Sequence, residues 1–264
     1  MINKLHAGTF KITLLLTGFL FFNGGSMYAQ NQITHAQSSC VILLHGLGRS
    51  SDSMDEIAES LVESGYHVWN ESYPSRDKPV SELAIEAIRP ALDYCQSRDI
   101  KQVHFVSHSL GGILVRYYLQ DHAIDQLGRI VMLSPPNKGS EIADKLKKFK
   151  LYQFLMGPAG TQLGTEPNSM PNQLEPIDGE IGVIIGRSTS DPWFSWLIPG
   201  EDDGKVSVAR ARLDEMKDFL VVEQGHTFIM KKAKVIKQIE HFLKYGEFNH
   251  SIKPEPTPAL WTER

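Results

Sequence analysis

Ser109 is the residue whose surroundings most favour covalent chemistry. It stands in the pentapeptide Ser107-His108-Ser109-Leu110-Gly111, after a β-forming apolar run and before a stretch with helical periodicity. A sharp strand-to-helix turn lifts one side chain out of the sheet, and the residues two before and two after it must be small. Ser107 and Gly111 meet this demand, although glycine is usual at the first position. The pattern predicts a nucleophilic serine at position 109.

A serine is a weak nucleophile unless a base takes its proton, and that base needs an acid to orient it. With such an elbow the expected chain order is serine, then acid, then histidine. Four histidines follow the serine, namely His122, His226, His241 and His250. His226 alone stands in a short loop between the last predicted strand and the final predicted helix. We therefore expect His226 to be the general base.

The acid is expected in the loop after the predicted strand 181–185. Three carboxylates are candidates, namely Asp191, Asp202 and Asp203. Asp203 directly precedes a glycine in "DDGKVSV", and an aspartate at this place begins a tight turn that aims the carboxylate inward. The sequence favours Asp203, with Asp202 and Asp191 as the alternatives.

Acyl transfer also requires hydrogen-bond donors for the oxyanion that develops on the carbonyl oxygen. One expected donor is the backbone N–H of Leu110, directly after the nucleophile. The second is expected from Leu47 in the loop "HGLG", whose glycines allow the backbone to approach a substrate closely. His45 opens that loop, and its place in the chain order favours a structural role.

The elements that must position these residues alternate along the chain. Apolar runs predict strands and helical periodicity predicts helices between them, which favours a mostly parallel sheet with helices on both faces. The predicted strands are 41–44, 66–69, 103–107, 129–133, 181–185 and 219–222, and the predicted helices are 52–63, 80–95, the stretch after Ser109 and 232–245. Pro90 is expected to kink or restart the second helix. Ligands bind at the carboxyl ends of parallel strands, where Ser109 stands.

The alternation of predicted strands and helices is interrupted between residues 138 and 178. This stretch is polar and rich in glycine and proline, with one apolar patch at 151–156, and it is too long for a plain connection. We expect a cap or lid over the carboxyl end of the sheet. The sequence thus predicts a leader segment at 30–39, one domain over 40–246 and a flexible tail at 247–264.

Taken in order, the motifs "LLHGLG", "SHSLGG", "SPPNKGS", "DDGKVSV" and "GHTF" resemble the α/β-hydrolase superfamily, in particular its bacterial lipase- and esterase-like members. The resemblance spans about residues 40–245. It implies the α/β-hydrolase fold, with Ser109 as nucleophile, His226 as base and Asp203 as acid. It also implies a serine ester hydrolase that acts through an acyl-enzyme. A thioesterase or amidase on the same fold, and a binding module without turnover, are the alternatives.

Two apolar segments bear on the substrate. Trp193 and Trp196 lie just before the predicted acid, where they would form an acyl pocket or a lipid-facing lip. The 151–156 patch has the same interpretation, and packing of each segment against the core is the alternative. The expected partner is a small-molecule or lipid ester.

The composition excludes other classes of partner. The net charge is −4 and there is no basic stripe, so nucleic acid is not an expected partner. No cluster of histidine, cysteine and carboxylate residues has metal-ligand spacing, so we expect no metal and no cofactor.

The first 29 residues follow the order of a secretory signal. Lys4 and Lys11 precede an apolar run over 12–22, which a polar segment with glycines then breaks before Ala29. We therefore expect a secreted or periplasmic protein, with an uncleaved N-terminal anchor as the alternative.

Cys40 and Cys95 are the only cysteines. Cys40 opens the first predicted strand and Cys95 closes the helix that leads to the nucleophile strand. In an oxidising compartment such a pair favours a disulfide, here at the amino end of the sheet and away from Ser109.

Overall fold

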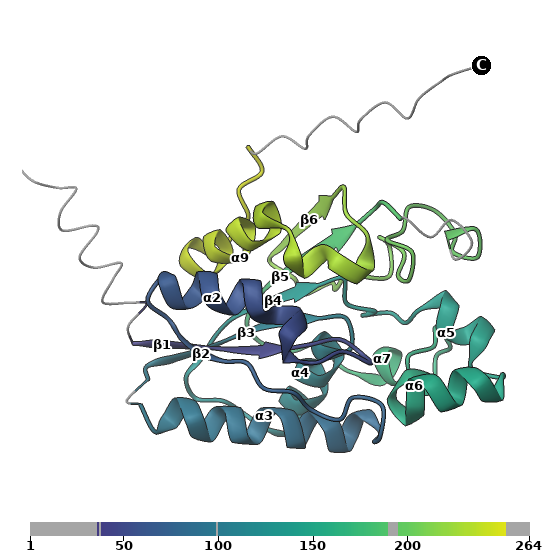
Figure 1. Ribbon diagram of the computed structural model, residues 1–264, viewed down its shortest axis with the longest axis horizontal. Helices are drawn as coiled ribbons and strands as arrows, with labels where there is room; N and C mark the ends of the chain where they lie inside the picture. The colour runs from purple at the N-terminus through teal and green to yellow at the C-terminus, as the bar shows by residue number, and fades with distance from the viewer. Residues whose placement is uncertain (1–35, 37, 99, 190–194, 252–264) are drawn as a thin grey trace, which may run out of the picture.

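The fold is built on one six-stranded sheet (Figure 1). The computed structural model describes residues 36–251 except 37, 99 and 190–194. The strand order is β2-β1-β3-β4-β5-β6, and every pairing between these strands is parallel. The strands are β1 (Ser39–Leu44), β2 (His67–Trp69), β3 (Gln102–His108), β4 (Leu127–Leu133), β5 (Glu180–Gly186) and β6 (Asp218–Val222). The predicted α/β class and its strands are confirmed.

Helices cover both faces of the sheet, α3 and α4 on one side and α2 and α9 on the other (Figure 1). The helices are η1 (Ser51–Met54), α2 (Asp55–Glu63), α3 (Val80–Gln96), α4 (Leu110–Asp121), α5 (Glu141–Leu146), α6 (Lys150–Gln162), α7 (Met170–Gln173), η2 (His226–Lys231) and α9 (Ala233–Tyr245).

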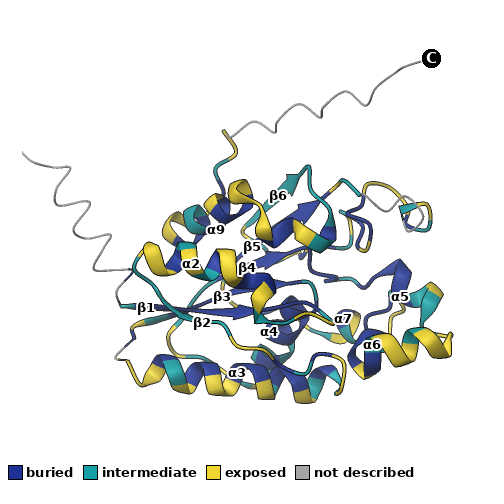
Figure 2. Cartoon of the chain, viewed as in Figure 1, coloured by how far each residue is buried: buried dark blue, intermediate teal, exposed yellow. Residues whose placement is uncertain are grey.

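The strand β1 shows why its sequence reads as one apolar run. Its residues are buried on both faces, as the dark central strands of Figure 2 show. Ile42 and Leu44 pack with α3 and α4, whereas Val41 and Leu43 pack with α2 and α9. A strand covered on both sides has no solvent face, so it needs no alternation of polar residues.

Of the two outcomes that the sequence predicts at Pro90, a kink or a restart of the helix, the restart does not occur. The helix α3 runs through Pro90 from Val80 to Gln96. Pro90 lies on the exposed side of α3, where water can solvate the carbonyl group that loses its partner. The opposite side of the helix is buried through Ile88 and Leu92, and this packing holds the helix together.

The segment 138–178 lies beyond the carboxyl ends of the strands, as expected for a cap (Figure 1). It contains α5, α6 and α7. The helix α6 is interrupted at Gly157, whose φ is +65°. A Cβ atom there would lie 1.6 Å from the carbonyl oxygen of Arg76, so only glycine fits this junction between the cap and the domain.

Packed residues lie beyond both predicted ends of the domain. The strand β1 begins at Ser39, inside the predicted leader segment. Phe248, in the predicted tail, is buried against Phe242 with ring centroids 4.8 Å apart, and its N–H donates to Asp218. A single phenylalanine in a polar segment is a weak sequence signal for such packing. Residues 1–35 and 252–264, including the predicted signal, lie outside the described residues.

Cys40 and Cys95 form a disulfide, as the sequence predicts, with Cα atoms 5.8 Å apart. Cys40 is the second residue of β1 and Cys95 is in the last turn of α3. The bridge therefore lies at the amino end of the sheet, while the elbow serine stands at the carboxyl end.

Reduction of this bridge should lower thermal stability and leave catalysis intact. The bridge closes a span of 55 positions, for which the chain-entropy model gives roughly 4 kcal/mol of stabilisation. In a domain of this size that is about 10 °C in melting temperature. We expect dithiothreitol to shift the calorimetric transition by this amount, while turnover at 25 °C stays within twofold. An unchanged transition, with two thiols titrated after reduction, would contradict the prediction.

Candidate active site

Ser109 occupies a strained turn between β3 and α4. Its backbone has φ +52° and ψ −116°, which a residue other than glycine rarely adopts. Gly111 permits the turn, because a Cβ atom there would lie 2.5 Å from the carbonyl oxygen of Leu44. The neighbour that demands glycine at 111 is therefore the backbone of β1. Such strain is typical of functional positions, since a tight core must hold it in place.

The structure brings Ser109, His226 and Asp203 into one chain of hydrogen bonds. Nε2 of His226 lies 3.0 Å from Oγ of Ser109, and Nδ1 lies 2.9 Å from Oδ2 of Asp203. A carboxylate only accepts, so Nδ1 carries the proton and Nε2 is free to accept from the serine hydroxyl. His226 follows β6 and Asp203 lies between β5 and β6, so three separate strand ends supply the three groups.

A local turn aims the Asp203 carboxylate at His226, as the sequence predicts. Its Oδ1 accepts from the backbone N–H groups of Lys205, at 3.0 Å, and Val206, at 2.9 Å. Gly204 has φ +95° in this turn. The backbone N–H of His226 also donates to the Asp203 carbonyl, which fixes the two residues together.

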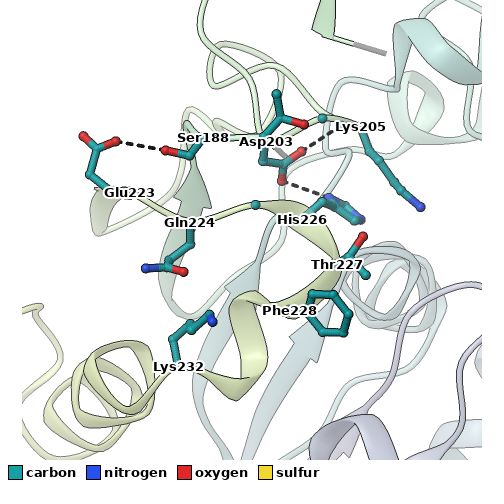
Figure 3. Close-up of a pocket in the computed structure, with 12 residues that line it drawn as sticks. Ser188, Asp203, Lys205, Glu223, Gln224, His226, Thr227, Phe228 and Lys232 are labelled. Carbon is teal, nitrogen blue, oxygen red and sulfur yellow. Dashed lines mark hydrogen bonds and ion pairs between the residues drawn. The ribbon is translucent and has the colours of Figure 1, made fainter. Parts of the chain in front are cut away.

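The surroundings of Asp203 keep it ionised. Burial alone would raise the pKa of the carboxyl, but the His226 ring and the hydrogen bonds that the carboxylate accepts hold the pKa below its ordinary value. Figure 3 shows the carboxylate pointing to the His226 ring on one side and to the Lys205 backbone on the other. A permanent negative charge is available to stabilise a protonated imidazole.

Asp202 and Asp203 differ sharply in their contacts. Oδ1 of Asp202 accepts from the Ser195 hydroxyl at 2.6 Å and from the Gly204 N–H at 2.7 Å. Its carboxylate therefore supports the loop, and it is Asp203 that meets the imidazole. Asp191, the third candidate, lies outside the described residues.

His108 is a site residue that the sequence analysis missed. It is buried, and its Nε2 lies 3.0 Å from the carbonyl oxygen of His226, to which it donates. Burial and the neighbouring His226 hold the pKa of His108 well below its ordinary value, so it stays neutral. Its side chain ties the elbow to the loop that carries the base. The signal was the histidine beside the serine in "SHSLGG".

The loop expected to supply an oxyanion donor lies beside Ser109. Leu47 and Ser109 line the same cavity. A Cβ atom on Gly46 would lie 2.7 Å from Nδ1 of His108, so glycine is required where this loop meets the elbow. His45 has the structural role expected of it, because its Nε2 accepts from the backbone N–H of Tyr73.

The cavity above Ser109 has a volume of about 480 Å³. Its wall opposite the elbow is apolar and comes mainly from the cap, through Ile142, Ala143, Leu146, Leu155, Met156 and Leu163. Tyr152 adds a hydroxyl to this wall, and burial raises its pKa to about 12, so it stays protonated. A second hollow of about 370 Å³ lies on the other side of His226 and is the one in Figure 3. Ser109 does not line that second hollow, so the cavity under the cap is the one that meets the serine.

Trp196 does not line the cavity, so the structure does not place it in the predicted acyl pocket, and its predicted lipid-facing role stays a prediction. Its side chain is 87% exposed, in a loop between β5 and β6. The predicted pocket wall is supplied instead by α5 and α6, which cover the carboxyl end of the sheet. Trp193 lies outside the described residues. In the patch 151–156, Leu155 and Met156 line the cavity, whereas Leu151 and Phe154 are exposed, and contact with lipid stays a prediction.

The part of the chain that the structure describes contains neither a candidate metal site nor a candidate membrane-spanning helix. No group of three or more histidine, cysteine, aspartate or glutamate residues there is arranged to hold a metal ion. Within the same residues, no helix combines the length and the apolar character that a bilayer crossing needs.

The sheet, the cap and the elbow serine define an α/β hydrolase fold. The model of the alpha/beta hydrolase family matches residues 41–231, and the chain belongs to this family. The fold is similar to that of the mature lipase BlEst2 of Bacillus licheniformis, with 21% identity, a TM-score of 0.61 and coverage of 79% of this chain and 93% of that one. The esterase Pf2001 of Pyrococcus furiosus is similar at 18% identity and a TM-score of 0.54, over 80% of this chain and 84% of that one. No curated protein matches the sequence.

Proposed function

We propose that the protein is a serine hydrolase that cleaves carboxylic esters through an acyl-enzyme. The observation that carries this proposal is the hydrogen-bonded chain of Ser109, His226 and Asp203, whose serine end opens into an apolar cavity. The similarity to a lipase and an esterase supports the fold that such chemistry uses.

In the first step, Nε2 of His226 takes the hydroxyl proton while Oγ of Ser109 attacks the ester carbonyl. The imidazolium then gives this proton to the departing alcohol, which leaves an acyl group on Ser109. Water repeats the sequence with His226 as base and releases the acid. Asp203 holds the imidazole in the tautomer that accepts from the serine, and its charge stabilises the imidazolium.

The oxyanion that forms in each step needs donors that are already in place. We assign this role to the backbone N–H groups of Leu47 and Leu110. Leu110 begins α4, whose first N–H groups lack partners within the helix and whose amino end carries partial positive charge. One such donor contributes about 10²-fold to 10³-fold in rate.

The cap suggests a lipid-like acyl chain. Phe154 is 84% exposed, and Phe149 and Leu151 beside it are also exposed. Leu155 is partly exposed and also lines the cavity, so the outer apolar face of α6 continues into the site. We propose that this face meets a lipid surface from which the substrate enters.

Export fits the same function. The Cys40–Cys95 bridge is typical of an oxidising compartment. Together with the predicted signal over residues 1–29, it supports a secreted or periplasmic location.

Assays of an ester, an anilide and a thioester that share one acyl group test which bond the protein cleaves. We expect p-nitrophenyl esters of increasing chain length to be hydrolysed fastest at chains that fit the cavity, with the matched anilide at least about 10²-fold slower. Emulsified triglyceride compared with the dissolved ester tests the lipid surface. A matched thioester that is hydrolysed more than tenfold faster than the ester would favour a thioesterase instead.

A matched pair of aspartate variants tests the acid. Asp203→Asn should lower kcat by about 10⁴-fold, because an amide leaves the imidazole in the wrong tautomer. Asp202→Asn should lower kcat by less than tenfold, because the carboxylate of Asp202 contacts only the loop. Steady-state kinetics on p-nitrophenyl butyrate, with melting temperatures as a fold control, provide the comparison. A larger loss for Asp202→Asn, or for Asp191→Asn, would overturn the assignment.

A further inference from the structure

We propose that the cavity selects esters that carry a negatively charged group near the ester bond, and that Arg49 and Arg76 bind this group. The inference rests on the proposed function and narrows its substrate class to anionic amphiphiles. Both arginines line the cavity that holds Ser109, together with Lys205. The side chains of these three residues have no role in the reaction proposed above.

Arg49 directly follows the oxyanion loop and reaches toward the base. Its guanidinium donates to the carbonyl oxygen of Thr227 at 3.3 Å and stands 5.9 Å from the centre of the Phe228 ring. This anchor keeps the charge beside η2, the helix that His226 begins. The charges of Arg49 and Lys205 both contribute to the lowered pKa of His108, so their fields extend to the elbow.

Arg76 approaches the same loop from the other side. Its Cδ lies 3.5 Å from the place where a Cβ atom on Gly48 would stand, and its own carbonyl oxygen abuts Gly157 of the cap. The Arg76 backbone is therefore held between the oxyanion loop and the cap. Its Nε lies 4.0 Å from the same Gly48 position, so the guanidinium group is held at the oxyanion loop on the wall of the cavity.

No carboxylate among the described residues neutralises these two arginines. Neither forms an ion pair with another described residue, and no described aspartate or glutamate lines the cavity. The nearest acid in the mechanism, Asp203, is buried and faces the imidazole. The chain as a whole has a net charge of −4, so two arginines at one cavity are a local feature of the described lining.

The two sides of the cavity thus differ in chemistry. The cap offers an apolar wall for an acyl chain, and the opposite side offers cations and the elbow. An ester with an apolar acyl chain and a phosphate or carboxylate on its alcohol part matches both sides at once. Arginine binds either anion through paired N–H groups. Each exposed cation is expected to raise the preference for the anionic ester in kcat/KM by about threefold to fivefold, which is the usual strength of an exposed ion pair.

The test compares 4-butyryloxybenzoate with its uncharged methyl ester, each rate divided by that of its hydroxide-catalysed hydrolysis. We expect the wild-type ratio of kcat/KM to favour the anion about tenfold, and 0.5 M NaCl to reduce this preference. The double variant Arg49→Gln/Arg76→Gln should bring the ratio close to one. Lys237→Gln, which removes an exposed charge on α9 away from the cavity, should keep the wild-type ratio. A wild-type ratio near one, or a double variant that keeps the preference, would overturn the proposal.

Binding separates this proposal from the proposed function. Calorimetric titration of Ser109→Ala with the two esters should give tighter binding of the anion, and the two added arginine substitutions should remove the difference. If no ester is hydrolysed but this difference is found, the proposed function fails and the anion site stands. Equal binding of the two esters would refute the site.

A second pair of substrates identifies the source of the anion. Dihexanoyl phosphatidylglycerol and dihexanoyl phosphatidylcholine are compared as dissolved monomers. Preference for the former assigns the site to anionic phospholipids. If the anion is preferred only within the benzoate pair, the site is assigned to soluble carboxylate esters. Either result supports recognition of a negative charge.

Discussion

Replacement of Ser109 by alanine is expected to abolish ester hydrolysis while the fold is retained. The hydroxyl is the only group of the triad that forms a bond to the substrate in the proposed mechanism. Loss of a triad nucleophile typically lowers kcat by about 10⁴-fold to 10⁶-fold. Alanine keeps the Cβ atom of serine and removes only the hydroxyl, so it adds no strain to the turn at φ +52°. The melting temperature should therefore stay close to that of the wild type.

Ser188→Ala provides the matched control. Ser188 lies on the other side of His226 and its hydroxyl donates to Glu223 (Figure 3). Its loss should leave turnover of p-nitrophenyl butyrate within about twofold of wild type. A Ser109 variant that kept a tenth of the wild-type rate would show that the nucleophile is elsewhere.

Replacement of His226 by alanine should lower kcat nearly as much as replacement of Ser109 does. Without the imidazole, the Ser109 hydroxyl has no base at 3.0 Å and the leaving alcohol has no proton donor. Because triad members act as a unit, the double variant Ser109→Ala/His226→Ala should be no slower than either single variant. Kinetics on the same ester, down to the rate without enzyme, provide the measurement.

His122→Ala is the control for this change. His122 follows α4 and its ring packs on Tyr118, with centroids 4.5 Å apart, away from the cavity. Its loss should leave kcat within about threefold. Retention of more than a tenth of wild-type turnover by the His226 variant would mean that another group is the base.

The parts of the site that could be predicted from sequence are those that depend on local chain geometry. The elbow at Ser109 and the turn at Asp203 each need small or turn-forming residues within three positions, so their signals are contiguous. His226 was found by elimination, because the fold fixes which loop faces the nucleophile. The strands were predictable for a similar reason, since each is a short apolar run between turns.

The parts that could not be predicted depend on contacts between distant segments. Arg76 lines the cavity and its carbonyl group packs on Gly157 of the cap, a contact across 81 positions that no local pattern reveals. The tryptophan at 196 failed as a pocket residue because an aromatic cluster does not say which way its loop points. The restart expected at Pro90 does not occur, because the buried face of α3 holds the helix together through the proline.

The most direct test of the central claim is the reaction of the wild-type protein with a fluorophosphonate, followed by intact-mass measurement and peptide mapping. Only a serine activated by a base reacts rapidly with this reagent. The proposed mechanism predicts one adduct per chain, located on Ser109, and labelling at least about 10²-fold slower in His226→Ala. No adduct on the folded protein, or an adduct on another serine, would contradict the claim that Ser109 is the nucleophile activated by His226.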